Sequence, residues 1–168
     1  MSRARMAVAG LALSAAAFIG IAIEENYTDS AIIPTKGDRP TLGLGSTFHE
    51  DGTPVKIGEK TTPVRALIKA GAHISKEEAR FRASLPGVEL HQAEYDIYMN
   101  WVYQYGTGRW TTSSMRKYLL VGDYRAACGA LLLYKKSAGY DCSIPGNKIC
   151  HGVWERQLKR HAACMGAQ

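Results

Sequence analysis

The chain of 168 residues and 18.4 kDa is long enough for one domain with its own core, and it is basic, with a net charge of +6 and a pI near 9.2. Such a charge suits either simple solubility or attraction to a polyanion, which could be nucleic acid, anionic lipid or the acidic polymers of a bacterial wall. Because the sequence has no RNP-like, zinc-finger or basic-helix pattern, we expect no nucleic-acid partner.

The first distinctive element is an uncharged run over residues 6–23, MAVAGLALSAAAFIGIAI. It is just long enough to cross a bilayer as a helix, and Arg3 and Arg5 ahead of it would keep the N-terminus in the cytoplasm. More than half of the run is Ala, Gly or Ser, so it would hold in a membrane weakly. We therefore expect an anchor segment, residues 1–23, and a folded domain, residues 24–168. The alternative is a signal peptide cleaved after the small residues 15–17.

The stretch after this run contains two short β-prone segments, residues 31–33 and 41–44, joined by a Gly–Asp turn at Asp38. The resulting hairpin would carry Asp38 at its bend and Thr41 just beyond it, facing back toward Glu25. Two carboxylates and a hydroxyl that converge on one groove are what glycoside hydrolysis requires. Taken alone, a Gly–Asp turn and a glutamate that ends an apolar run are also typical of ordinary surface structure.

Two helices are predicted after a polar loop over residues 48–61. Thr62 is a suitable N-cap and Pro63 a suitable first residue, so one helix begins there and is expected to stop near Gly71. A capping box at residues 75–78 starts the next helix, which ends before the Pro–Gly pair that follows.

Residues 91–106 have aromatic and apolar side chains at spacings of three and four, which is typical of a buried amphipathic helix (Tyr95, Tyr98, Trp101, Val102 and Tyr105). Two short helices, a loop over residues 140–149 and a closing helix over residues 153–165 are predicted to follow. The scattered histidines are assigned no role (His49, His73 and His91).

All four cysteines lie in the last quarter of the chain (Cys128, Cys142, Cys150 and Cys164). An even number confined to one region indicates disulfides, and hence an oxidising compartment. No C-x-x-C pair is present and no histidine stands at finger spacing, so we expect no metal site. Spacing alone leaves all three disulfide pairings open.

The carboxylate pattern resembles the phage lysozyme family, the muramidases of the endolysin type. The family motif runs Glu, then Asp, then Thr directly before an Ile/Leu-Gly-x-Gly strand, and Glu25, Asp38 and Thr41 stand at these places. The chain has Asn26 where Gly commonly follows the glutamate, and Ser46 where His often follows the Gly-x-Gly. Its interval from glutamate to turn is longer than in the best-known members.

The resemblance implies a role for each residue of this motif. Glu25 would be the general acid, and burial would have to raise its pKa for it to stay protonated near neutrality. Asp38 and Thr41 would hold the attacking water in an inverting reaction, without a metal or an organic cofactor. Asp29 is the alternative second carboxylate, and Glu24 is a less suitable acid than Glu25.

The second half of the chain resembles the same family. Tyr103 and Gln104 fall where the family lines its sugar groove. Their chemistry suits this place, since aromatic faces stack on pyranose rings and amides hydrogen-bond to acetamido groups. The resemblance to exported endolysins also implies disulfides that join Cys128 to Cys164 and Cys142 to Cys150.

The resemblance implies an α+β, lysozyme-like fold with a small N-terminal antiparallel-sheet lobe and a mostly helical C-terminal lobe. The implied activity is hydrolysis of the β-1,4 bond between N-acetylmuramic acid and N-acetylglucosamine in peptidoglycan, leading to lysis of the host cell. We expect a monomer, exported, tethered to the host inner membrane through residues 6–23 and then released to the periplasm, as in signal-anchor-release endolysins. The alternatives are a lytic transglycosylase, a non-catalytic membrane-tethered wall-binding protein, or membrane disruption by the N-terminal segment.

Overall fold

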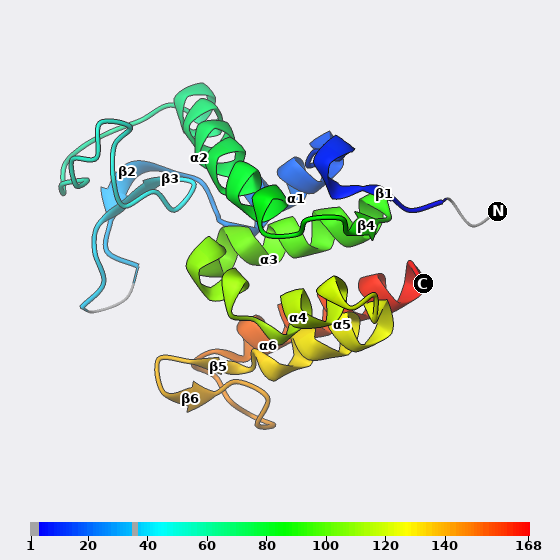
Figure 1. The fold of residues 1–168 in the computed structure, drawn as a ribbon. Coiled ribbons are helices and arrows are strands. Elements are labelled where there is room, and N and C mark those ends of the chain that lie inside the picture. The colour runs from blue at the N-terminus through cyan, green and yellow to red at the C-terminus, as the bar shows by residue number, and fades with distance from the viewer. Residues whose placement is uncertain (1–3, 35–36) are drawn as a thin grey trace. The chain divides into compact units, whose positions relative to one another are not determined.

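The computed structural model of the protein describes residues 4–34 and 37–168 (Figure 1). The chain forms two compact units. The first comprises the N-terminal residues up to Leu13 together with Arg80–Gln168, and the second is Ser14–Ala79. Helices predominate, and the strands form short antiparallel pairs, which confirms the predicted α+β class.

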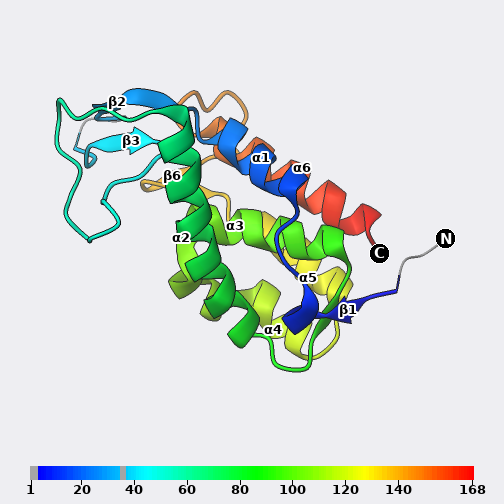
Figure 2. The ribbon, with the colours of Figure 1, turned by 90° about the horizontal axis from the view of Figure 1, so that it is seen from above.

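The second unit contains the predicted hairpin. Strand β2 (Thr28–Ile32) pairs antiparallel with β3 (Thr41–Gly43), as Figure 2 shows, and Ile32 lies opposite Thr41. The backbone of residues 59–61 bonds to the other edge of β2, where the Ala31 amide donates to the Glu59 carbonyl at 2.9 Å. Both edges of β2 are therefore occupied, which fixes the strand that follows Glu25.

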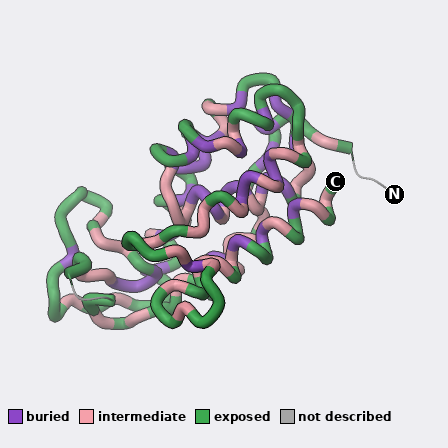
Figure 3. The backbone as a smooth tube through the Cα atoms, turned by 90° about the horizontal axis from the view of Figure 1, so that it is seen from below, coloured by how far each residue is buried: buried purple, intermediate pink, exposed green. Residues whose placement is uncertain are grey.

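Helix α1 (Ala15–Glu24) precedes this hairpin and packs against it and against α2. It begins at Ser14, whose hydroxyl accepts a hydrogen bond from the Ala17 amide at 3.1 Å, as an N-cap does. One apolar cluster holds α1, the turn after β3 and the first half of α2 together (Phe18, Ala22, Leu44, Ala66 and Ala70). The loop over residues 48–61 is mostly exposed, as predicted, and is largely green in Figure 3.

Helix α2 (Pro63–Ala83) is one helix, so the predicted break near Gly71 is wrong. The Ser75 hydroxyl donates to the Gly71 carbonyl one turn earlier, at 2.9 Å, instead of capping a new helix. Buried side chains on either side of the expected break, Ala70 at 3% and Phe81 at 0% exposure, keep the same helix packed. Packing therefore overrides the local stop signal.

The first unit is built on α3 (Gln92–Thr111), which is kinked at Gly106, where φ is +79°. Four of the five residues predicted to be buried in this helix are fully buried (Tyr95, Tyr98, Trp101 and Val102), whereas Tyr105 is half-buried. The rings of Tyr95, Tyr98 and Trp101 join those of Phe81 and Trp110 in one aromatic core, in which the Phe81 and Tyr95 ring centres are 5.3 Å apart. Such aromatic packing supplies much of the buried apolar area of a small unit.

The rest of the first unit comprises α4 (Ser114–Leu120), α5 (Tyr124–Ala130), η2 (Leu131–Leu133), β5 (Lys136–Ser137), β6 (Tyr140–Asp141) and α6 (His151–Gly166). It has the two short helices and the closing helix in the predicted order, but the second short helix ends at Ala130, and η2 and the strand pair β5–β6 after it were not predicted. Disulfides join Cys128 to Cys164 and Cys142 to Cys150, as the family resemblance implied. The first bond connects α5 to α6, and the second closes the loop after β6.

The uncharged run at the N-terminus does not form one continuous helix in this structure. It comprises β1 (Met6–Ala7), η1 (Val8–Gly10), an irregular link and α1. Val8 and Leu11 are buried in the first unit, and β1 pairs with β4 (Glu89–Leu90). Among the described residues, no helix is both long and apolar enough to cross a membrane. Whether residues 1–23 also serve as an anchor therefore remains a prediction.

Arg5, one of the two basic residues ahead of the run, makes an ion pair with a fully buried carboxylate. Its guanidinium donates to both Glu94 oxygens at 3.1 Å and stacks over the Tyr124 ring at 3.7 Å. Glu94 also accepts from the His91 amide at 2.8 Å and from the Gln168 amide at 2.7 Å. The buried charge is thus neutralised and its hydrogen bonds are satisfied, as burial of a carboxylate requires.

Arg5→Gln is expected to destabilise the protein by roughly 2–3 kcal/mol, because it leaves the Glu94 charge buried without its cation. Denaturant unfolding monitored by tryptophan fluorescence measures the loss. The control is Arg125→Gln, which removes an exposed arginine from the same unit and should leave stability close to wild type. Equal stability of the Arg5 and Arg125 variants would contradict the role given to this ion pair.

Candidate active site

Glu25 lies where α1 ends. Its backbone amide makes the last helical bond, to the Ile21 carbonyl at 3.1 Å. The next residue, Asn26, is in the left-handed region, with φ of +51°. Glycine adopts this conformation most readily, and asparagine is among the few other residues that tolerate it. Asn26 therefore fits the place where the family commonly has Gly, and the helix ends directly after Glu25.

The Glu25 carboxyl lies against the Gly-x-Gly turn that follows β3. A Cβ placed on Gly45 would be 2.8 Å from Glu25 Oε2. Two backbone hydrogen bonds between Leu42 and Ser46, of 2.9 and 3.1 Å, close the turn. Gly43 is buried at φ +68°, and a Cβ there would be 2.9 Å from the Ala66 Cβ. The first glycine thus seats the turn on α2, and the second lets the backbone approach the carboxyl.

Gly45→Ala is expected to lower activity about tenfold or more, because the added methyl would displace the Glu25 carboxyl from its place. The control is Gly52→Ala in the same unit. Gly52 also has a positive φ, +84°, but a Cβ there would meet nothing within 4 Å. Both variants carry a similar backbone strain, so a comparison of kcat/KM on peptidoglycan isolates the contact with Glu25. An equal effect of the two variants would contradict it.

Asp38 and Thr41 lie on the returning side of the hairpin. Thr41 is the first residue of β3, half-buried, and its hydroxyl is 3.5 Å from the Ile32 carbonyl. Asp38 is exposed, three residues earlier, just after a Gly37 with φ of +94°. Gly37 lies in a turn and Asp38 follows it, whereas Lys36, the first residue of the predicted turn, lies outside the described residues. The assignment of Asp38 and Thr41 to the attacking water remains a prediction.

Asp29, the alternative second carboxylate, lies within β2 and is exposed. Its Oδ1 accepts a hydrogen bond from the neighbouring Ser30 hydroxyl at 3.1 Å, and its carbonyl accepts one from the Thr61 amide at 2.9 Å. The backbone of Asp29 is thus fixed by the sheet, whereas Asp38 belongs to the connecting loop. Substitution at both positions is needed to choose between them.

The two residues predicted to bind sugar, Tyr103 and Gln104, are half-buried on α3 in the first unit. Gln104 Oε1 accepts a hydrogen bond from Arg160 of α6 at 2.7 Å. Arg160 is buried and also donates to Asn100 Oδ1 at 2.6 Å. This contact orients the Gln104 amide. The role of Tyr103 and Gln104 in binding sugar remains a prediction.

Two contacts of predicted residues were not predicted from the sequence: the hydrogen bond from Arg160 to Gln104 in the first unit, and the approach of Glu25 to Gly45 in the second. Arg160 has one available signal: it falls on the buried face of the closing helix together with Gln157 and Cys164. A buried arginine needs acceptors, and these come from an element about sixty residues earlier in the chain. The contact between Gly45 and Glu25 has no sequence signal beyond the Gly-x-Gly pattern itself.

Comparisons with known proteins place the chain among lysozymes. The family model described as phage lysozyme matches residues 22–159. The endolysin of Salmonella phage P22 is 31% identical over 122 residues, which are 70% of this chain and 75% of that protein.

Solved structures agree in fold. The endolysin from Escherichia coli O157:H7 phage FAHEc1 superposes with a TM-score of 0.78 at 22% identity, covering 95% of this chain and 96% of that chain. The muramidase domain of SpmX from Asticaccaulis excentricus has a TM-score of 0.73 at 14% identity, covering 92% and 97%. The fold is therefore lysozyme-like.

Proposed function

The chain belongs to the phage lysozyme family, and on this basis we propose that it is an endolysin that cleaves the bond between N-acetylmuramic acid and N-acetylglucosamine and so lyses the host cell. It is a hydrolase of the lysozyme type, and its substrate is peptidoglycan. The observation that carries the finer proposal is the position of Glu25, whose carboxyl is held against the glycine turn after β3.

In the proposed reaction Glu25 acts as the general acid. It gives its proton to the glycosidic oxygen while the bond from that oxygen to the anomeric carbon breaks, and positive charge develops on the sugar. Asp38 and Thr41 hold a water on the opposite face. The water attacks the anomeric carbon and loses its proton to the Asp38 carboxylate, which inverts the configuration. Each group is within one hairpin and the helix end before it, so the second unit supplies all three.

Loss of turbidity of Gram-negative cells stripped of their outer membrane tests the proposed activity. Purified protein at catalytic, substoichiometric concentration should clear the suspension, and the rate should scale with enzyme concentration. A protein that only binds the wall would coat the cells without clearing them. That outcome would contradict the proposed function.

We also propose that residues 6–23 tether the exported protein to the host inner membrane before release to the periplasm. The support is their weak apolar composition and the exposed side chains they keep in the folded protein, Ile19 at 58% and Ile23 at 72% exposure. Residues 6–23 cannot form a membrane helix and keep their folded conformation at the same time. Insertion would remove Val8 and Ile21 from their buried positions and would displace α1, which ends at Glu25. The tethered protein would therefore be inactive, and the released monomer active.

Leucine at Gly10, Ala12, Ala16 and Gly20 is expected to keep the protein in the membrane. Each change adds about half a kcal/mol or more to insertion. A Cβ at Gly10 or Gly20 would meet nothing within 4 Å, and Ala12 and Ala16 are exposed, so the folded enzyme has room for these changes.

Fractionation before and after collapse of the membrane potential measures the effect. Wild type should move to the periplasm, and the leucine variant should stay in the inner membrane while remaining active after detergent extraction and refolding. Release of both proteins alike, or a mature N-terminus directly after Ala17, would contradict the tether.

A further inference from the structure

A small polar pocket lies beside the catalytic hairpin, within the second unit. It has a volume of about 140 Å³ and is bordered by β3, by the loop over residues 48–61 and by the first turns of α2. Gly43 lines it, and Gly43 belongs to the same five-residue turn whose Gly45 contacts the Glu25 carboxyl. The pocket and the predicted general acid therefore share one structural element.

The pocket carries excess positive charge. Its lining includes three cations, Lys60, Arg65 and Lys69, and one carboxylate, Glu50. The remaining titratable group in the lining, His49, makes a hydrogen bond of 2.8 Å to Glu59. In the part of the chain that the structure describes, neither the Arg65 nor the Lys69 side chain makes a salt bridge or a hydrogen bond.

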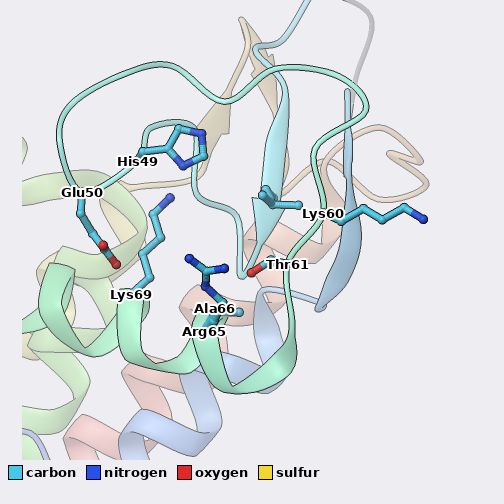
Figure 4. Close-up of a pocket in the computed structure, with 9 residues that line it drawn as sticks. His49, Glu50, Lys60, Thr61, Arg65, Ala66 and Lys69 are labelled. Atoms are coloured by element: carbon cyan, nitrogen blue, oxygen red, sulfur yellow. The ribbon is translucent and has the colours of Figure 1, made fainter.

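Arg65 and Lys69 are the two cations of the pocket that are placed to bind the same anion. They are four residues apart on α2, so they share one face of the helix. Figure 4 shows both side chains extending from α2 toward the side of the pocket where His49 lies, whereas Lys60 extends away from them. Partial burial lowers the pKa of Lys69, and the negative charges of Glu50, Glu59 and Asp51 act in the opposite direction without cancelling this effect. An anion placed between the two cations would relieve this cost.

The size of the pocket limits what it can hold. Sites for whole small-molecule ligands measure about 300–1,000 Å³, so this one suits a single charged group and not a sugar ring. Peptidoglycan offers such groups next to the scissile bond, because its muramic acid residues carry short peptides with free carboxylates. An arginine fork binds a carboxylate through two parallel hydrogen bonds.

We propose that Arg65 and Lys69 form a subsite for a carboxylate of the peptide that substitutes the glycan, and that this subsite directs the enzyme to peptide-bearing strands. This inference rests on the proposed function. It adds a preference for peptidoglycan whose glycan strands still carry peptides, and this preference depends on a peptide carboxylate and not on the glycosidic bond that is cleaved.

The kinetic test compares two substrates: intact sacculi, and sacculi from which an amidase has removed the peptides. The measured quantity is the ratio of kcat/KM on the first to kcat/KM on the second. Each partly exposed contact between a cation and a carboxylate is worth about two- to fivefold in affinity, so the Arg65→Gln/Lys69→Gln variant should lower the ratio about fivefold or more. The matched control is Lys56→Gln/Lys76→Gln, which removes the same charge from exposed positions of the same unit outside the pocket. It should leave the ratio unchanged.

An equal change of the ratio in both double variants would show general attraction of a basic protein to an acidic polymer, and would overturn the subsite. An unchanged ratio in the pocket variant would overturn it as well.

A binding measurement separates failure of the subsite from failure of the proposed function. The wild-type protein is titrated with N-acetyl-D-glutamate and, in parallel, with inorganic phosphate, and the NMR signals of the Arg65 and Lys69 side chains are followed. Saturable shifts with the carboxylate probe that exceed those with phosphate support the subsite even if no hydrolysis is found. No saturable shift, or stronger binding of phosphate, would overturn it.

Discussion

Glu25→Gln is expected to lower peptidoglycan hydrolysis about a thousandfold, because the amide has no proton to give to the leaving oxygen. The amide has nearly the same shape as the carboxyl, so it should keep its place beside Gly45, and the melting temperature should stay close to wild type. Initial rates of reducing-end release from purified sacculi measure the loss.

The neighbouring carboxylate provides the control. Glu24 is the last residue of α1, is exposed, and differs from Glu25 by one position. Glu24→Gln should retain activity within about twofold, as is typical of a surface substitution. Loss of activity in the Glu24 variant with retention in the Glu25 variant would assign the acid to Glu24.

Asp38→Ala is expected to lower the rate about a hundredfold, because the attacking water would lose both its position and its proton acceptor. Asp38 is exposed in a loop, so its removal should change stability little. The same rate assay, with thermal unfolding alongside, checks both parts.

Asp29→Ala is the matched comparison, since Asp29 is also an exposed aspartate of the hairpin. It should reduce activity only slightly. Should Asp29→Ala abolish activity while Asp38→Ala stays active, the second carboxylate is Asp29 and the loop has no part in the reaction.

Local patterns in the sequence were sufficient to predict much of the fold. The predicted cap Thr62 accepts a hydrogen bond from the Arg65 amide at 3.4 Å at the start of α2, and the helical spacing of Tyr95, Tyr98 and Trp101 marks a buried face. These features depend on residues within a few positions of one another. Resemblance to a family supplied the disulfide pairs, which spacing alone left open.

Features set by distant contacts could not be predicted in the same way. The buried Glu94 pairs with Arg5, which is 89 residues away, and no local sequence pattern near either residue predicts this ion pair. The helix break expected near Gly71 is wrong for the same reason, because the burial of Ala70 before it and Phe81 after it keeps α2 continuous. Hydropathy could identify residues 6–23 as membrane-compatible but could not show that Val8 and Leu11 also fit the folded protein.

The candidate site also has features that local sequence patterns predict and features that depend on distant contacts. The Gly-x-Gly pattern and the glutamate before it were visible in the sequence, because the turn needs glycine at two positive φ angles. The approach of the Glu25 carboxyl to Gly45 was not, and neither was the pocket formed by α2 and the loop before it. Both depend on how the hairpin packs on α2.

The chemical identity of the products tests the central claim most directly. Sacculi digested with the wild-type protein are reduced with borohydride, and the fragments are analysed by mass spectrometry. Hydrolysis between N-acetylmuramic acid and N-acetylglucosamine predicts fragments that end in reduced N-acetylmuramic acid. Ends that are 1,6-anhydro and resist reduction would identify a lytic transglycosylase, and ends in reduced N-acetylglucosamine would identify cleavage of the other bond; either result would contradict the proposed function.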